Sequence, residues 1–368
     1  MRRIFAQTRK ELTQLVRDRL ALALAFALPL ILLVLLGSAI ALTVSDLPIV
    51  VQDLDNTPAS RDFTDAFRAS ITFHIVPWST DQQPEEAFRH NQARAALIIP
   101  AHFGRDLARG ANTPVQLLVD ATDANTAKLL QGYAAEITQA YSSSGGGAAR
   151  PQPVHADIRL WYNPGRVSKK FYGPGIFVLG ISMFPPLLAA LAMSREGEQK
   201  TILQVYVSNI SAHEFLLGKI FAFMTIALAE WVVAMLAMFT YFGLSLAGDP
   251  TPLIVATVLY TFTVASFGTM VGAAIPNQAA AIQAVALGGF LLVFLLSGLI
   301  FPVENIPAGL RWISNIVWGK YYIAIVRDAL LQGGGWPSMW PGVAAIGAIG
   351  SFFYGLAWKR MRRMQLSY

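Results

Sequence analysis

The sequence predicts an α-helical polytopic membrane protein with six transmembrane helices and an inserted extracytoplasmic α/β domain. Of its 368 residues, 54% are hydrophobic and 14% are charged, whereas about a quarter of the residues in soluble domains are charged. Six mostly apolar stretches are long enough to cross a bilayer. Residues 45–170, between the first and second stretch, have an ordinary soluble composition instead. These three observations together define the fold class.

The six predicted spans follow from length, since a hydrocarbon core about 30 Å thick requires about 20 apolar helical residues. They cover residues 20–44, 171–193, 215–243, 252–274, 279–301 and 340–358. Pro174, Pro185 and Pro186 interrupt the second span, so we expect that helix to kink or to begin late. A cleaved signal peptide is the alternative for 20–44, but the apolar core of such peptides has only about 7 to 15 residues.

The distribution of basic residues predicts the orientation, because lysine and arginine near the spans stay on the cytoplasmic side. Six of them precede the first span: Arg2, Arg3, Arg9, Lys10, Arg17 and Arg19. Four follow the last span: Lys359, Arg360, Arg362 and Arg363. Both termini are therefore predicted to be cytoplasmic, and residues 45–170 extracytoplasmic. The net charge of +6 marks topology and does not indicate binding of nucleic acid.

The soluble segment alternates short apolar runs with amphipathic stretches, which predicts a small α/β domain. Predicted strands cover 48–51, 71–76, 95–99 and 115–119, and predicted helices cover 59–69, 85–91 and 128–141. Residues 142–147, Ser-Ser-Ser-Gly-Gly-Gly, have the composition of a flexible connector. A further strand is expected at 154–160, before the chain re-enters the membrane.

Motifs for catalysis or metal binding are absent from the sequence. There is no cysteine, the five histidines lack metal-ligand spacing, and neither a Gly-x-Ser-x-Gly elbow nor a Gly-x-Gly-x-x-Gly loop occurs. Asp53, Asp55, Asp120 and Asp123 stand at strand ends, where turn and cap roles are common. The chain also lacks a Gly-x-x-x-x-Gly-Lys-Ser/Thr phosphate loop, so it is not expected to be an enzyme.

The loop at 194–219 combines a charged start with apolar positions, a pattern typical of a short helix at a membrane face. It carries Arg195-Glu196, then Thr201-Ile202-Leu203, and later Glu214 followed by Leu217-Gly218-Lys219. In these features the loop resembles the inner loop of ABC-2 type permeases, the membrane subunits of bacterial ABC exporters. Lys200 stands in place of the family's glycine, and Ser208-Asn209-Ile210 in place of Thr-Pro-Ile.

A second segment of the chain resembles the same family. Residues 297–307, Ser-Gly-Leu-Ile-Phe-Pro-Val-Glu-Asn-Ile-Pro, are similar to its outer re-entrant segment, which we extend over 302–335. The resemblance implies an outer gate with Phe301, Pro302 and Glu304. Amphipathic helices at the outer interface are expected over 305–335, with Arg311, Lys320 and Arg327 solvated.

The resemblance, which fits best the drug-efflux subgroup, implies an exporter subunit of the bacterial inner membrane. It implies two ABC ATPase subunits that hold ATP and Mg, a second permease that is identical or paralogous, and alternating access driven by the ATPases. A periplasmic adaptor is a further possible partner. The resemblance assigns coupling to the ATPase to nine residues: Arg195, Glu196, Thr201, Ile202, Leu203, Val205, Glu214, Gly218 and Lys219. The rival interpretations are a membrane-anchored sensor or assembly factor, and a permease for lipid or polysaccharide.

Glu230 is the one ionisable residue near the middle of a predicted span, where a carboxylate costs at least about 2.5 kcal/mol on insertion scales. Helical spacing places it on a stripe of small and aromatic residues, so it is expected to face protein. Two roles remain open. Glu230 either lines the export path and favours cationic substrates, or makes a structural hydrogen bond.

Overall fold

The computed structural model describes residues 1–39, 46–79, 82–90, 92–111, 113–120, 124–143, 168–200, 210–299, 303 and 306–364. The chain divides into two compact units. Met1–Ala41 and Leu160–Tyr368 form a helical unit, and Leu42–Arg159 form an α/β unit. The division agrees with the predicted insertion of a soluble segment after the first span.

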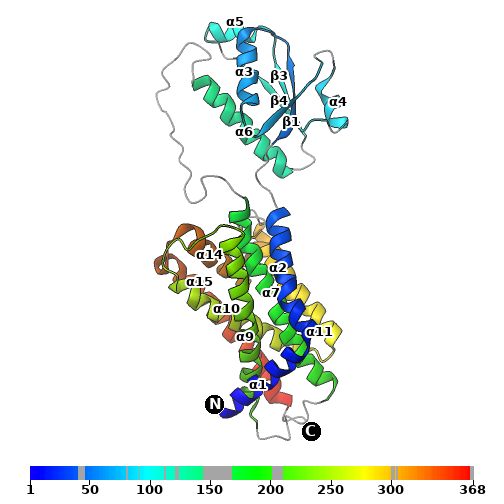
Figure 1. The fold of residues 1–368 in the computed structure, drawn as a ribbon, viewed down its shortest axis with the longest axis vertical. Helices are drawn as coiled ribbons and strands as arrows, with labels where there is room; N and C mark the ends of the chain where they lie inside the picture. Colours follow the sequence, from blue (N-terminus) through cyan, green and yellow to red (C-terminus); the bar gives the residue numbers. More distant parts are fainter. Residues whose placement is uncertain are drawn as a thin grey trace. The chain divides into compact units, whose positions relative to one another are not determined.

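The helical unit is built from long apolar helices and a few short ones (Figure 1). They are α1 (Arg2–Arg17), α2 (Arg19–Ala39), α7 (Ser168–Glu198), α9 (Ala212–Thr240), α10 (Thr251–Ala274), α11 (Gln278–Val285), α12 (Leu292–Leu296), α13 (Ala308–Ser314), α14 (Trp318–Arg327) and α15 (Trp336–Met364). π-Helical turns connect α11 to α12 over Ala286–Leu291 and follow α14 over Asp328–Gln332.

Among the described residues, five helical runs are long and apolar enough to cross a membrane. They are α7, α9, α10, the run from Gln278 to Leu296 through α11 and α12, and α15. The pair α1 and α2, bent by 95° at their junction, would be a sixth. The protein is therefore a polytopic membrane protein with five or six candidate spans, in line with the predicted six.

Helix α7 corrects one expectation from the sequence. It begins at Ser168 and runs without a break through Pro174, Pro185 and Pro186, so the predicted late start is wrong. Membrane helices tolerate proline where neighbouring helices support the freed backbone groups. α7 has such support from α2, α9, α10 and α14, which all pack against it.

Helix α14 does not lie at the outer membrane interface, which the sequence had predicted for this region. Trp318, Tyr322 and Val326 are buried, and α14 packs against α7, α10 and α15. The expectation fails because an amphipathic pattern, which α14 has, is the same whether the apolar face packs on protein or lies at a membrane interface. Arg327, predicted to be solvated, stacks on the Phe171 ring at 4.2 Å. The predicted gate residues Phe301, Pro302 and Glu304 lie outside the described residues.

The α/β unit contains a four-stranded sheet in the order β2-β1-β3-β4. Its strands are β1 (Leu47–Asp53), β2 (Phe73–Val76), β3 (Ala95–Ile99) and β4 (Gln116–Val119). β1 pairs in parallel with β2 and β3, and β3 pairs antiparallel with β4. All four strands occur where the short apolar runs predicted them.

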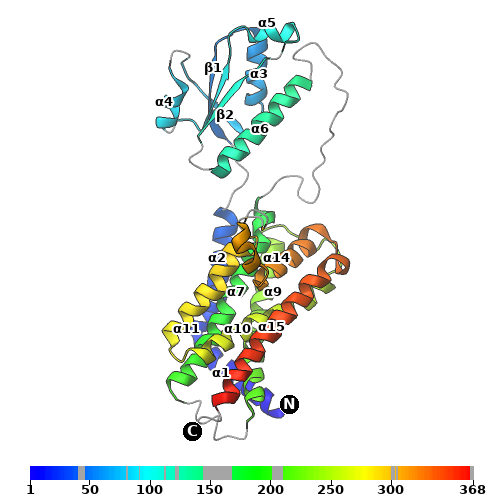
Figure 2. The same cartoon turned by 180° about the vertical axis from the view of Figure 1, so that it is seen from behind.

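Four helices cover this sheet (Figures 1 and 2). They are α3 (Pro58–Arg68), α4 (Pro84–Arg89), α5 (Phe103–Ala108) and α6 (Ala124–Ser143). Side chains of α3, α5 and α6 share one core with Ile49 and Leu97, and α4 contributes Ala87 to the core on the other face.

The three predicted helices are confirmed, whereas α5 was not predicted. α6 includes Ser142 and Ser143, which were expected in the connector, and 154–160 lies outside the described residues.

The turn roles predicted for the acidic residues after β1 are confirmed. Asp53 Oδ1 accepts hydrogen bonds from the backbone N–H groups of Asp55 and Asn56 at 3.0 and 3.1 Å. Asp55 accepts from Thr57 Oγ1 and from the Gly104 N–H. The hydrogen bond from Thr57 lowers the pKa of the Asp55 carboxyl below its ordinary value. Within the described ranges, no group of three or more His, Cys, Asp or Glu residues could hold a metal ion.

Candidate functional site

Helix α1 lies against the start of α9, at the end of the helical unit where α15 also ends (Figures 1 and 2). The two backbones approach closely at Gly218, where an added Cβ would stand 2.5 Å from the Gln7 Cβ. Thr8 Oγ1 donates a hydrogen bond to the Gly218 carbonyl oxygen at 2.9 Å. Gly218 is therefore required for the docking of α1, because any larger residue would displace that helix.

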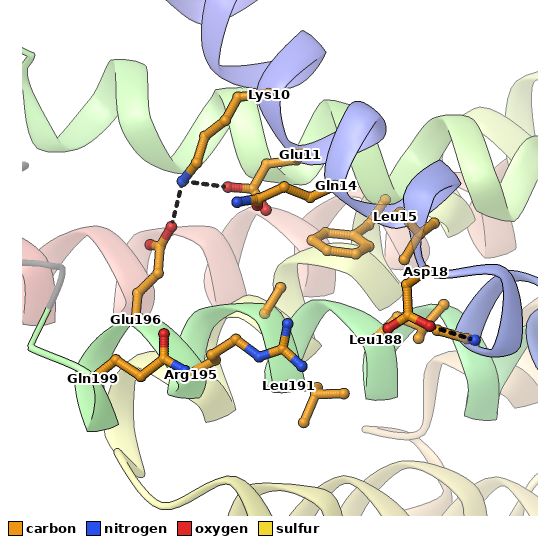
Figure 3. A pocket seen from close by; sticks show the side chains of 13 residues that line it. Lys10, Glu11, Gln14, Leu15, Asp18, Leu188, Leu191, Arg195, Glu196 and Gln199 are labelled. Atoms are coloured by element: carbon orange, nitrogen blue, oxygen red, sulfur yellow. Dashed lines mark hydrogen bonds and ion pairs between the residues drawn. The ribbon is translucent and has the colours of Figure 1, made fainter.

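A buried ion-pair cluster joins α1 to α7 and α9. We call Lys10, Glu11, Glu196 and Lys219 the inner charge cluster. Lys219 Nζ lies 2.8 Å from Glu11 Oε1 and 3.2 Å from Glu196 Oε2. Lys10 Nζ lies 2.7 Å from Glu196 Oε1 and 3.4 Å from Glu11 Oε1, as Figure 3 shows. The two lysines and two glutamates thus form a compact group in which each charge lies next to opposite charges and the net charge is zero.

Most of the inner charge cluster is buried, so its charges must be paired to avoid a large desolvation cost. The side chains of Lys219 and Glu11 are only 1% and 4% exposed, whereas that of Lys10 is 43% exposed. Burial by itself lowers the pKa of Lys10, but the hydrogen bond to Glu196 and the nearby charges of Glu11 and Glu196 raise it above its ordinary value. Gln7 Nε2 donates a further hydrogen bond to Glu11 Oε1 at 2.9 Å. The middle of α1, the end of α7 and the first turns of α9 are therefore held together electrostatically.

The structure describes five of the nine predicted coupling residues: Arg195, which is exposed near the end of α7, and Glu196, Glu214, Gly218 and Lys219. Glu196, Gly218 and Lys219 meet at α1, as described above. Glu214 also meets α1, because its Oε2 lies 3.6 Å from Arg3 Nη1. In addition it forms the capping box of α9: it accepts from the Ser211 N–H at 3.0 Å, and its own N–H donates to Ser211 Oγ at 3.2 Å. Thr201, Ile202, Leu203 and Val205 lie outside the described residues.

The predicted loop 194–219 is shorter than expected, because α7 continues to Glu198 and α9 begins at Ala212. α7 continues through Gly197, which the sequence had placed in the loop, and Ser211 caps α9. Sequence reasoning used Lys10 only as a marker of topology and did not single out Glu11. The signal was the i, i+4 pair of Gln7 and Glu11, which lies on the same helix face as the partly buried Leu12 and Leu15.

Glu230 occupies a second buried site within the bundle. Its residue is 3% exposed, and neither carboxyl oxygen has a hydrogen-bond partner within the described part of the chain. It lies beside Gly180 of α7, where an added Cβ would stand 3.7 Å from Glu230 Oε1 and 3.3 Å from the Pro29 Cβ of α2. The prediction that Glu230 faces protein is confirmed. A structural hydrogen bond, the alternative role, is not present among the described groups.

Polar groups on neighbouring helices are paired with each other rather than with Glu230. Ser182 bonds to the Tyr260 hydroxyl, and Thr257 Oγ1 lies 2.7 Å from the Tyr322 hydroxyl. The rings of Tyr260 and Tyr322 stack with centroids 4.0 Å apart. This pairing satisfies the buried hydroxyls and leaves the Glu230 carboxyl as an isolated buried acid.

Comparison with known proteins agrees with this architecture. The probable multidrug ABC transporter permease YbhS of Escherichia coli K12 is 26% identical over 366 residues, covering 98% of this chain and 97% of YbhS. YbhR of the same organism, also named a probable multidrug ABC transporter permease, is 26% identical, with 96% and 98% covered. The inner membrane transport permease YhhJ of that organism is 24% identical over 326 residues, with 86% and 85% covered. A family model described as ABC-2 family transporter protein matches residues 20–359, and the chain therefore belongs to the ABC-2 family of transporters.

Proposed function

We propose that this ABC transporter permease subunit exports drug-like or amphiphilic compounds from the cytoplasm of a bacterium by alternating access. ATP and Mg are held by separate ATPase subunits, because this sequence contains no phosphate loop. A second permease, identical or paralogous, completes the path, and the α/β unit faces the periplasm, where an adaptor can be recruited. The multidrug names of YbhS and YbhR support this class of substrate.

The inner charge cluster is the observation that carries the proposal. Residues 201–209 connect the end of α7 to the start of α9, and the cluster ties these two helix ends to each other and to α1. A force applied to the connecting segment by a closing ATPase would thus act on three helices as one group. Close-packed elements transmit such displacements because they do not deform continuously.

A charge placed in the connecting segment tests the ATPase contact. We expect Leu203→Glu to weaken the binding of the ATPase partner by about tenfold or more, because a carboxylate would be desolvated in an apolar interface. The measurement is co-purification of the ATPase with the tagged permease from native membranes, together with substrate-stimulated ATP hydrolysis in proteoliposomes. Arg360→Gln, an exposed change on α15, is the matched control. Unchanged binding and hydrolysis in Leu203→Glu would exclude this segment as the coupling contact.

The same purification discriminates the sensor interpretation. If native membranes yield no ATPase with the permease, and proteoliposomes containing both chains move no solute, the chain is a sensor or assembly factor. A permease for lipid or polysaccharide would keep the ATPase but would export those compounds and no drug-like ones.

Glu230 is proposed to line the export path when the helices around it separate. Its carboxyl is buried, has no hydrogen-bond partner among the residues that the structure covers, and is shielded by Gly180 and Pro29, so separation of α9 from α2 and α7 would expose an acid at the midplane. An acid there favours cations over neutral compounds. We expect Glu230→Gln to reduce export of cationic substrates by about tenfold, the effect of one charge-assisted contact.

Transport assays with paired substrates measure this effect. The export of a neutral substrate by the same Glu230→Gln variant is the internal control, because glutamine keeps the size of the side chain and removes only its charge. Equal export of cationic and neutral substrates at the wild-type rate would rule out the path role for Glu230.

A further inference from the structure

A cavity of about 290 Å³ lies between α1, the end of α7 and α9. Its walls differ in chemistry, as the side chains in Figure 3 show. Leu15, Leu188, Leu191 and Phe223 form an apolar wall, and Arg195 together with the outer side of the inner charge cluster forms a polar one. A cavity with one apolar and one charged wall is suited to an amphiphilic ligand.

The charged side chains that line the cavity have a polar partner within the described part of the chain, with one exception. Glu11 and Glu196 are paired with Lys10 and Lys219 within the inner charge cluster. Asp18 accepts a hydrogen bond from the Ala21 N–H at 3.0 Å, at the start of α2, where the helix dipole also favours a negative charge.

Arg195 is the exception. Among the residues that the structure describes, no acidic group contacts its guanidinium, and its side chain is exposed. Figure 3 shows the side chain running along α7 towards Leu191, the direction in which helical side chains lean. A guanidinium offers five N–H donors in a planar fork that matches the oxygens of a phosphate. The cavity therefore carries one unpaired cation beside an apolar wall.

The position of the cavity along the helices matches the depth of lipid headgroups. The apolar helix α2 begins at Arg19, next to the cavity, and the apolar part of α7 gives way to the charged Arg195 and Glu196 at the same place. Charged residues mark the level where hydrocarbon ends. The cavity thus lies at a membrane interface, with its apolar wall on the hydrocarbon side.

Helix α1 has the features of a helix that rests on an anionic membrane. It carries five basic residues and one acidic residue, Glu11. Phe5 and Val16 are 72% and 59% exposed, and a shallow hollow on the same helix is lined by Arg9, Lys10 and Arg17. Exposed apolar side chains combined with excess positive charge are typical of interfacial helices that bind anionic lipid.

We propose that this cavity binds the headgroup of an anionic phospholipid, with Arg195 donating to its phosphate and the first part of an acyl chain lying along Leu188 and Leu191. A free phosphate would use the guanidinium but would gain nothing from the apolar wall. The volume accommodates a headgroup and the adjoining glycerol, so the rest of the lipid remains in the bilayer. The lipid would hold α1 against α7 independently of the transported compound.

Binding of short-chain lipids to the purified full-length protein tests the proposal. The protein is prepared in a neutral detergent and titrated with dihexanoyl phosphatidylglycerol, dihexanoyl phosphatidylcholine or inorganic phosphate, and binding is followed by native mass spectrometry and by thermal unfolding. We expect phosphatidylglycerol to bind about tenfold more tightly than phosphatidylcholine, the effect of one charge-assisted contact. Inorganic phosphate that binds as tightly as phosphatidylglycerol would overturn the assignment to a lipid.

Variants of the cavity separate the role of Arg195 from general electrostatic attraction. Arg195→Gln is expected to reduce phosphatidylglycerol binding by about tenfold, and Arg195→Lys by less, because it keeps the charge. Arg360→Gln removes one exposed positive charge at the same end of the bundle and should bind the lipid as the wild type does. Equal binding by wild type, Arg195→Gln and Arg360→Gln would refute the site.

A second variant keeps the test independent of the charge at Arg195. Ala192→Phe places a ring in the cavity without changing any charge, so it should reduce lipid binding while the unfolding temperature of the lipid-free protein stays near the wild-type value. Undiminished lipid binding by Ala192→Phe would place the lipid elsewhere.

Discussion

Replacing Lys219 with methionine is expected to destabilise the helical unit by about 3 kcal/mol, the lower part of the range for breaking a buried ion pair. The substitution keeps the length of the side chain but leaves Glu11 and Glu196 with Lys10 as their only cation in the inner charge cluster. Thermal unfolding of the purified protein in detergent measures the loss. Because the cluster ties α1 to α7 and α9, substrate-stimulated ATP hydrolysis should fall as well.

Lys10→Met is the matched control for this prediction. It removes the same charge from the same cluster, but the Lys10 side chain is 43% exposed and that of Lys219 is 1% exposed. Exposed ion pairs contribute about 0 to 1 kcal/mol, so Lys10→Met should cost much less. Equal losses in the two variants would show that burial of the cluster does not determine its contribution.

A double variant separates the ion pair from the loss of the lysine as such. Lys219→Met combined with Glu11→Gln leaves Lys10 and Glu196 as a complete pair 2.7 Å apart. Removing both partners of a buried pair is often close to neutral, whereas removing one is costly. The double variant should therefore be more stable than Lys219→Met alone, which a double-mutant cycle measures directly.

Local sequence patterns predicted most helices and strands of the fold. Long apolar runs located the candidate spans and short ones located β1 to β4, because both kinds of buried segment are visible in consecutive residues. α5 was missed because it has only six residues and follows His102, whose φ of 71° is not signalled by a glycine. α14 was predicted at the membrane interface because its apolar residues indicate a buried face. They do not indicate whether lipid or other helices cover that face.

Local sequence patterns did not predict the pairing of charges in the candidate site. The family resemblance marked Glu196 and Lys219, but the partner of Lys219 is Glu11, which lies 208 residues away in the chain. The periodicity of a helix does not relate residues so far apart in the chain. The pairing of Lys219 with Glu11 depends instead on the angle at which α1 crosses α9. The close approach at Gly218 fixes that angle, and a single sequence does not indicate which glycines serve such contacts.

The contact between α7 and α10 yields the second large effect. Gly268 and Gly272 lie four residues apart on α10, the spacing that lets two membrane helices touch along their backbones. A Cβ at Gly268 would overlap the Pro186 carbonyl oxygen and approach the Pro186 Cα to 2.7 Å. A Cβ at Gly272 would stand 2.5 Å from the Ala190 carbonyl oxygen. These obstacles are backbone atoms, so no side-chain rotation can relieve the overlap.

Gly268→Ala is therefore expected to force α10 away from α7 and to destabilise the bundle by about 3 kcal/mol, the upper part of the range for overpacking. Gly268→Leu should prevent assembly, seen as loss of the monodisperse peak in size-exclusion chromatography. Gly355→Ala is the matched control, because a Cβ at that position of α15 would meet nothing within 4 Å, and alanine favours a helix over glycine by about 1 kcal/mol. If Gly268→Ala and Gly355→Ala unfold at the same temperature, α7 and α10 do not pack through this glycine, and the unbroken course of α7 past Pro186 must have another support.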